Sequence, residues 1–172
     1  LADIRRYARD EGFRQLFHFY SDNSSCLRRS VWELYPYPDV DFAEDQLWAK
    51  QIVEAGYRKA FAWNSVVYHS HDYSLPERLR RSYDEARALN ELFGYQLCLS
   101  KRELLAKALK SSAHDILLAI RRGWVFSHPL ATLTRPLDNL ARQAGYYLGT
   151  TRPAFTQRYS QRLSRDRRLN AQ

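Results

Sequence analysis

Apolar residues recur three or four positions apart along much of the chain, which is the spacing of one face of an α-helix. This pattern predicts a helix over Glu44–Ala55 and another over Pro76–Phe93. Beyond Lys101 the pattern stays helical, is broken over Gly123–Pro129, and resumes over 137–148. A shorter helix is expected over 28–34, because two prolines soon follow it.

Two stretches are rich in residues that favour β-strands. Phe13–Tyr20 is short and aromatic and leads into the polar turn Ser21–Ser25. Ala60–His69 is rich in Phe, Trp, Val and Tyr. We therefore expect a strand in each. A charged helix is expected before the first strand, over 2–11, with Gly12 as its stop.

Charge is distributed unevenly along the chain. Residues 1–100 hold 13 Lys+Arg and 15 Asp+Glu, a net of −2. Residues 101–172 hold 14 and 4, a net of +10, and the end over 158–172 is rich in arginine. A basic segment of this kind indicates contact with an anionic partner such as a phospholipid surface or nucleic acid. Solvated helix faces are the alternative.

Cysteine content and hydropathy exclude several classes of protein. Cys26 and Cys98 stand far apart, so neither a disulfide framework nor a zinc site is predicted. No apolar run approaches the roughly 20 residues that a membrane-spanning helix needs. The chain begins at Leu1, inside a predicted amphipathic helix, so we expect it to be a piece of a longer protein.

Four acidic residues fall within seven positions, namely Asp39, Asp41, Glu44 and Asp45. Glu44 and Asp45 lie in the first turn of a predicted helix, where free N–H groups and the helix dipole stabilise negative charge. Acids are common there for that reason alone. Asp39 and Asp41 could grip a divalent cation that carries a nucleotide diphosphate. They follow prolines and no hydrophobic strand, which favours a loop or helix-capping role.

A second group of candidate residues follows the second predicted strand. One residue separates His69 from His71, so in an extended chain both side chains point to the same side. Two imidazoles can bind a metal together, or one can bind it while the other orients a phosphate oxygen. The next helix carries Arg78, Arg80 and Arg81, and arginine forks match phosphate geometry. The group indicates a site for an anion, with a solvated helix face as the alternative.

Four segments resemble, in order and spacing, the carboxyl-terminal half of family 2 glycosyltransferases: Ser21–Trp32, Glu44–Lys50, Glu54–Ala60 and Val67–Ser74. The nearest type is the bacterial rhamnosyltransferase that builds cell-surface polysaccharide. The resemblance implies an α/β fold class, with a partial GT-A (Rossmann-like) fold for nucleotide-diphospho-sugar transfer. Residues 1–95 would form the carboxyl-terminal, acceptor-binding half of that fold. Residues 96–172 would form a basic tail of amphipathic helices.

The resemblance also implies roles for residues near the acidic turn. Asp45, with Glu44 beside it, matches the base that takes the proton from the acceptor hydroxyl as it attacks the anomeric carbon. Inversion of configuration follows from one in-line displacement. The acceptor pocket would be lined by Asp22, Asn23 and Ser24. Trp48 and Trp32 would either stack on sugar or pack in the core.

The resemblance implies cofactor and donor contacts as well. His69, with His71 as the second candidate, matches a ligand to a divalent metal, Mg²⁺ or Mn²⁺, that neutralises the departing diphosphate. Arg80 or Arg81 would hold the same diphosphate. The expected donor is a nucleoside-diphosphate sugar, with rhamnose suggested by the nearest type. The expected acceptor is a saccharide or a lipid-linked sugar.

The chain departs from the family in lacking the amino-terminal strands, the nucleotide pocket and the usual Asp-x-Asp motif. We therefore expect little activity without the missing amino-terminal half. The apolar stripe of the helices could pack onto that half or onto a second subunit. The resemblance implies a cytoplasmic protein that is peripheral at the inner face of the plasma membrane, because family acceptors are often lipid-linked sugars there, and basic amphipathic helices fit that role. Nucleic acid is disfavoured as a partner. The alternative function is a non-catalytic remnant or binding module whose basic helices contact anionic lipid or nucleic acid.

Overall fold

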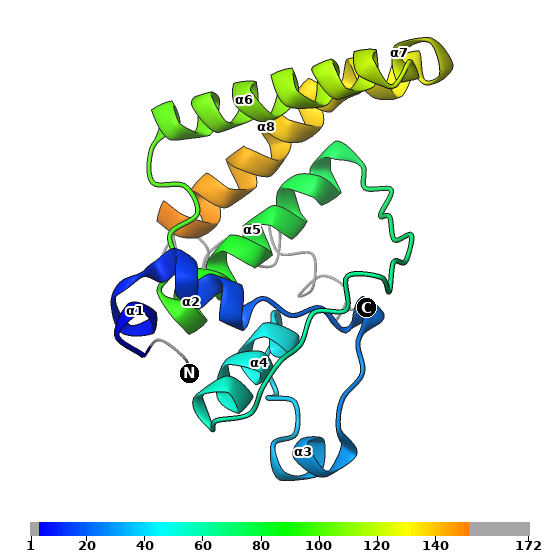
Figure 1. Cartoon of the computed structure of the whole chain (residues 1–172). Coiled ribbons are helices and arrows are strands. Elements are labelled where there is room, and N and C mark those ends of the chain that lie inside the picture. The colour runs from blue at the N-terminus through cyan, green and yellow to red at the C-terminus, as the bar shows by residue number, and fades with distance from the viewer. Residues whose placement is uncertain (1–3, 152–172) are drawn as a thin grey trace, which may run out of the picture. The chain divides into compact units, whose positions relative to one another are not determined.

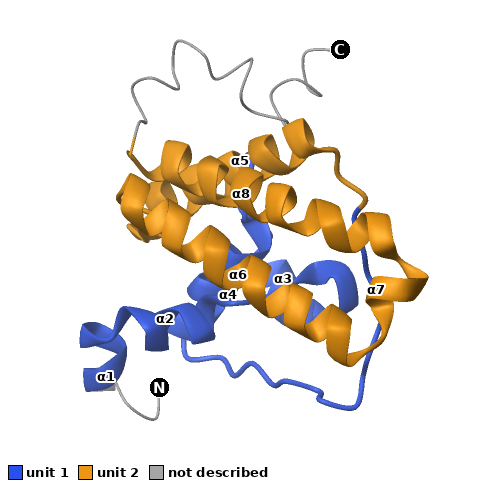
Figure 2. Cartoon of the chain, turned by 90° about the horizontal axis from the view of Figure 1, so that it is seen from above, with its two compact units in different colours: residues 1–71 blue, residues 72–172 orange. Residues whose placement is uncertain are grey.

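A computed structural model describes residues 4–151 of the chain. The chain divides into two compact units, unit 1 over residues 1–71 and unit 2 over residues 72–172 (Figure 2). Unit 1 contains α1 (Ile4–Arg9), α2 (Glu11–His18), the 3-10 turn η1 (Asp22–Ser24), α3 (Arg29–Leu34) and α4 (Glu44–Glu54). Unit 2 contains α5 (Leu75–Phe93), α6 (Lys101–Arg121), α7 (Trp124–Ser127) and α8 (Pro129–Thr151) (Figure 1).

The strand predicted over 13–20 is wrong, because most of that stretch is helix α2. Asp10 caps the helix, since its carboxylate accepts a hydrogen bond from the backbone N–H of Phe13 at 3.0 Å. Phe13 and Phe17, one helical turn apart, pack with ring centroids 4.8 Å apart. Gly12 lies inside α2 and does not end the preceding helix. A cap and an aromatic pair at helical spacing have outweighed the β-propensity of single residues.

The end of α2 is held by a residue from beyond α4. The ammonium of Lys59 donates to three backbone carbonyls, those of Leu16, Phe17 and Phe19. These carbonyls have no partner within the helix, and a cation also suits the negative end of the helix dipole. Burial lowers the pKa of Lys59. The contact ties two parts of unit 1 that are about forty residues apart in sequence.

A buried histidine joins α1, α2 and α4. His18 is 3% exposed, and its Nε2 lies 2.6 Å from the hydroxyl of Tyr7. That hydroxyl donates to the carboxylate of Glu54 at 2.9 Å. Burial lowers the pKa of His18 to about 4, so the imidazole is neutral at physiological pH. The hydrophobic core of unit 1 is built from Val31 of α3 and from Trp48 and Ile52 of α4. Partly buried side chains pack around them, namely Tyr20, Leu27, Tyr35, Tyr37 and Tyr57.

The strand predicted over Ala60–His69 is absent from the described structure. Residues 60–69 form no regular element, and nearly all of their side chains are exposed. A strand is stable only when its backbone groups pair with a neighbouring strand, and residues 4–151 contain none. The α/β fold class implied by the family resemblance stays a prediction.

The other predicted helices are confirmed, with one change of boundary. α3, α4, α5 and α6 begin and end within a residue or two of the expected positions. α5 opens with a capping box, in which the side chain of Ser74 and its backbone N–H both bond to Glu77. α8 begins at Pro129 and not at 137, so Pro136 lies inside it. Pro136 has no N–H to donate, so one backbone hydrogen bond of α8 is missing there, and α8 nevertheless continues and packs against both α5 and α6.

The boundary between the two units differs from the predicted one. The units divide after His71, whereas the sequence placed the boundary after residue 95. The reason is that α5 packs along α8 and so belongs with the basic helices. The assignment of these parts to an acceptor half and a tail stays a prediction. The arginine-rich end over 158–172 lies outside the described residues.

Two glycines of α8 allow its backbone to lie directly against α5. Gly145 and Gly149 are four residues apart and therefore share one face of the helix. A Cβ atom at Gly145 would lie 2.4 Å from the carbonyl oxygen of Leu79. At Gly149 it would lie 2.5 Å from the carbonyl oxygen of Tyr83. No side chain larger than hydrogen fits at either position without separating the helices.

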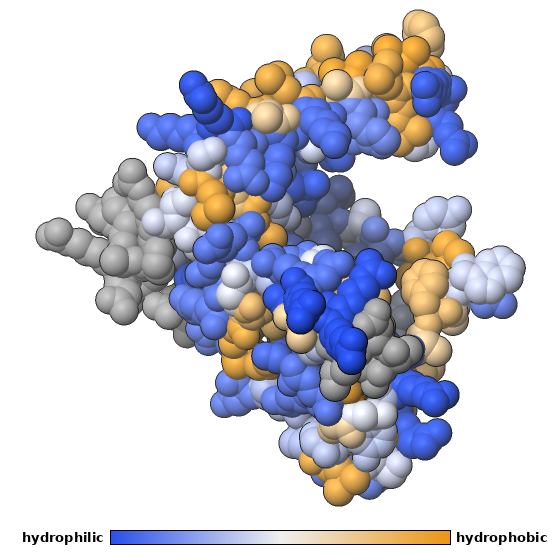
Figure 3. Space-filling model, turned by 60° about the vertical axis from the view of Figure 1, so that its left-hand side comes forward, coloured by the Kyte–Doolittle hydropathy of each residue, from blue (hydrophilic) through white to orange (hydrophobic). Residues whose placement is uncertain are grey.

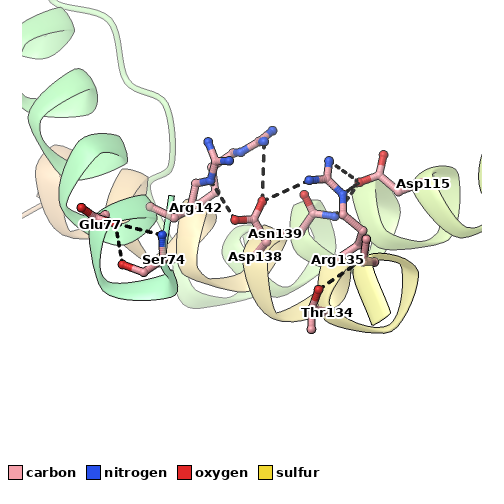
Figure 4. A network of polar contacts seen from close by, with 10 residues as sticks. Ser74, Glu77, Asp115, Thr134, Arg135, Asp138, Asn139 and Arg142 are labelled. Atoms are coloured by element: carbon pink, nitrogen blue, oxygen red, sulfur yellow. Dashed lines mark hydrogen bonds and ion pairs between the residues drawn. The ribbon is translucent and has the colours of Figure 1, made fainter. Parts of the chain in front are cut away.

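Polar contacts fix the alignment of the helices of unit 2 (Figure 4). The guanidinium of Arg78 on α5 contacts the carboxylate of Asp138 on α8 at 2.8 Å. Arg135 contacts Asp115 of α6 at 3.2 Å, and the same carboxylate accepts from the amide of Asn139 at 3.0 Å. Asn139 is 1% exposed, and its amide also donates to the hydroxyl of Ser112 at 3.4 Å, so both acceptors of this buried amide lie on α6. None of the helices in residues 4–151 is long and apolar enough to cross a membrane.

We expect Gly145→Ala to lower the free energy of unfolding by about 1–3 kcal/mol, because the added methyl group overpacks the contact between α5 and α8. Chemical denaturation followed by circular dichroism measures this change. Gly12→Ala is the matched control, since a Cβ at Gly12 would meet its nearest neighbour at an ordinary 3.5 Å. The control should hold or raise stability. Equal losses in the two variants would contradict the overpacking account.

Candidate active site

The chain enters α4 through a left-handed residue. Ala43 has φ of 61° and ψ of 30° and is buried. Residues other than glycine seldom adopt this conformation, and such positions cluster at functional sites. Glu44 and Asp45 follow in the first turn of the helix, as predicted. Glu44 is exposed and Asp45 is half-buried.

Asp45 is the carboxylate whose proton affinity is altered most clearly in this region. Burial raises its pKa, and the negative charges of Glu44 and Asp22 raise it further. Backbone N–H groups of Gln46, at 2.7 Å, and of Asp22 donate to the carboxylate and partly oppose the rise. The net direction is upward. A carboxylate with a raised pKa is a stronger proton acceptor than an exposed aspartate.

The turn η1 lies beside Asp45, which brings together two groups that the sequence had placed in one site. Asp22 reaches Asp45 through its backbone N–H and its charge. Asn23 and Ser24 are exposed in the same turn, and the amide of Asn23 donates to the hydroxyl of Ser21 at 2.9 Å. The turn therefore offers polar side chains to solvent next to a carboxylate that can accept a proton.

Two tyrosines near this carboxylate were missed by the sequence analysis. The rings of Tyr20 and Tyr37 pack on Trp48, with centroid distances of 5.5 and 5.4 Å. Burial raises the pKa of Tyr37, and Tyr20, Asp22 and Asp45 contribute to the rise. Two sequence features could have drawn attention to these tyrosines: the aromatic stretch that ends at Tyr20, and the prolines on either side of Tyr37. Neither pattern says which aromatic rings meet.

Trp48 is a core residue of unit 1. It is 3% exposed, and its indole N–H donates to the backbone carbonyl of Tyr35. Of the two roles expected for Trp48, stacking on sugar or packing in the core, the structure shows packing in the core. Trp32 is 43% exposed. A pocket of about 570 Å³ lies nearby, lined by Leu34, Tyr35, Pro36, Tyr37, Pro38, Gln51 and Glu54. Tyr37 belongs both to this pocket and to the aromatic group near Asp45.

His69 and His71 lie side by side, as the spacing predicted, although the predicted strand is absent. Their Nε2 atoms are 2.8 Å apart and their ring planes are perpendicular. Two converging imidazoles can supply two ligands to one metal ion. No group of three or more His, Cys, Asp or Glu side chains within residues 4–151 is placed to hold a metal. The metal role of this pair stays a prediction.

Arg80 and Arg81 lie in α5 of unit 2, whereas the other candidate residues lie in unit 1. Both side chains are half-buried. The neighbouring Arg78 is occupied by Asp138 and lies over the ring of Tyr73 at 4.9 Å. The diphosphate role of Arg80 and Arg81 stays a prediction.

Comparison with known proteins relates part of the chain to glycosyltransferases of cell-surface polysaccharide synthesis. The chain is 38% identical over 68 residues to the O-antigen chain rhamnosyltransferase RfbN of Salmonella typhimurium (strain LT2). It is 35% identical over 68 residues to the O-antigen chain rhamnosyltransferase WbaN of Salmonella anatum. Each match covers 38% of this chain and 22% of the relative, or about a fifth of the relative's length. No protein-family model and no solved structure matches the chain.

We expect Asp45→Asn to raise the melting temperature at neutral pH by about 1–3 °C. The raised pKa means that the folded chain holds this proton to a higher pH than the unfolded chain does. The protein with Asp45 therefore loses stability as pH rises from 3.8, the ordinary pKa of an aspartate, through the higher pKa of the folded state. An asparagine side chain does not ionise and avoids that loss. Thermal unfolding at pH 7 and below pH 3.8 measures the difference, which should vanish at the lower pH. A lower melting temperature for Asp45→Asn at pH 7 would show that the helix dipole outweighs burial.

Proposed function

We propose that this chain forms the acceptor side of an inverting glycosyltransferase, in which Asp45 is the catalytic base. The observation that carries the proposal is the half-buried carboxylate of Asp45, which has a raised pKa in the first turn of α4 and lies beside the turn at Asp22. The similarity of 68 residues to proteins named O-antigen chain rhamnosyltransferases supports the reaction class. The donor is a nucleoside-diphosphate sugar, with rhamnose as the sugar that those names suggest.

In this reaction the acceptor hydroxyl loses its proton to the carboxylate of Asp45 while its oxygen attacks the anomeric carbon. The bond from that carbon to the diphosphate breaks as the glycosidic bond forms, so configuration inverts and the diphosphate leaves. Glu44 contributes through its charge, which raises the pKa of Asp45. The exposed amide of Asn23 and hydroxyl of Ser24 are the groups in the same turn that can hydrogen-bond a saccharide or lipid-linked acceptor.

The remaining candidate residues serve the donor diphosphate in this proposal. His69 and His71 are the side chains that would hold a divalent metal, Mg²⁺ or Mn²⁺, and that ion would neutralise charge on the diphosphate. Arg80 or Arg81 would donate paired hydrogen bonds to its oxygens. The fold proposed for the whole enzyme is GT-A. Residues 1–95 contribute to its acceptor half, and the helices of 96–172 follow it.

The base is tested by Asp45→Asn in the full gene product. We expect turnover to fall by about 10²- to 10⁴-fold with the donor KM little changed, because the amide cannot accept the proton. Release of nucleoside diphosphate at saturating donor measures turnover. Asp39→Asn, at an exposed acid five residues before the start of α4, is the matched control and should keep its turnover. Unchanged turnover in a folded Asp45→Asn protein would remove Asp45 from the role.

The metal ligand is tested by His69→Ala. We expect the metal concentration needed for half-maximal activity to rise by about 10- to 100-fold, as when a residue that supports a metal is lost. His114→Ala, an exposed histidine on α6, is the control and should leave the metal titration unchanged. The same titration on His71→Ala shows which of the two histidines contributes more to metal binding. If neither variant shifts the titration, the metal does not bind at this pair.

A further inference from the structure

The far end of unit 2 exposes a large apolar surface. We define the helical tip as residues 116–134, which comprise the end of α6, α7 and the start of α8. Gly123, with φ of 70°, ends α6 and lets the chain turn into α7. Phe126 is 90% exposed, and the other exposed apolar side chains of the tip are Leu117, Leu118, Ile120, Trp124, Leu130 and Leu133. Figure 3 shows apolar side chains gathered over the helices at the top of the view.

This surface is too apolar to be ordinary solvent-facing protein. Single exposed apolar residues are normal, but a contiguous group of this size marks a contact with a partner or a membrane. A pocket of about 390 Å³ opens in the same region, with Leu118, Trp124 and Ala131 among its lining residues. The described residues therefore leave the apolar side chains of the tip without a cover.

The charge of the helical tip indicates which kind of partner can pack on its apolar side chains. Residues 116–134 contain two arginines, Arg121 and Arg122, and no Asp or Glu, and both arginines are exposed. A second copy of the same tip would bring like charges together. The segment 152–172 holds six arginines and one acidic residue, so it is also a poor partner on charge. An anionic, apolar partner is the one that complements the tip.

We propose that the helical tip docks on an anionic phospholipid bilayer. Trp124 and Phe126 enter the boundary between headgroups and acyl chains, where aromatic rings are favoured. Arg121 and Arg122 lie beside them in sequence and contact headgroup phosphates. The helices lie on the surface and do not span it, in keeping with the hydropathy of the described helices. The proposal goes beyond the glycosyltransferase reaction and holds or fails independently of it.

The test is sedimentation of the full gene product with vesicles of phosphatidylcholine alone and with about one-third phosphatidylglycerol. We expect binding to the anionic vesicles only, weakening as salt rises. The double change Trp124→Ser and Phe126→Ser should reduce the association constant at least tenfold. Arg121→Gln with Arg122→Gln should reduce it and flatten its salt dependence.

The matched control is Trp63→Ser with Phe61→Ser, because these residues are of the same types and are 80% and 90% exposed in unit 1. The control should bind anionic vesicles as the unchanged protein does. Circular dichroism verifies that each variant is folded, and the arginine variant, altered only at exposed side chains, provides the test if the aromatic variant does not fold. Equal loss in tip and control variants, or equal binding to neutral vesicles, would overturn the proposal. If the protein binds no vesicles but forms a dimer, and the tip variant abolishes that dimer, the surface would be assigned to a second copy of the chain.

Discussion

The close approach of α8 to α5 is the constraint on which unit 2 depends. Gly145 and Gly149 present only hydrogen to the backbone of α5, so any larger side chain would separate the helices. This contact places Arg78 against Asp138, and the polar chain through Arg135 and Asp115 then aligns α6. A helix contact with buried polar groups of this kind specifies one alignment, because a shifted helix would leave charges unpaired. The helical tip is presented at the far end of that rigid arrangement.

Unit 1 is organised around a second constraint, the burial of Trp48 and the aromatic rings that surround it. Packing of Tyr20 and Tyr37 on Trp48 places the turn η1 beside the first turn of α4. The carboxylate of Asp45 loses part of its hydration there, and its pKa rises for that reason before any neighbouring charge is considered. Burial that costs stability at neutral pH is also what makes the group a better proton acceptor. The proposed chemistry of Asp45 and the packing of the core are two consequences of the same arrangement.

The two units offer complementary properties to a glycosyltransferase of cell-surface polysaccharide. Unit 1 carries the proposed base and exposed polar groups that can hydrogen-bond a hydroxylated acceptor, while the tip of unit 2 carries exposed apolar and cationic side chains. The chain is similar over 68 residues to proteins named O-antigen chain rhamnosyltransferases.

The sequence alone determined the features that depend on near neighbours. The helical period of the apolar residues predicted α4, α5 and α6, and with them the position of Asp45 in a first turn. Alternation along an extended chain placed His69 and His71 together. Tertiary structure decided the rest, because partners distant in sequence have no local signal. Lys59 secures α2 where β-propensity favoured a strand, and the packing of α5 on α8 moved the boundary between the units to His71. The tyrosines around Trp48 likewise became visible only once the chain had folded.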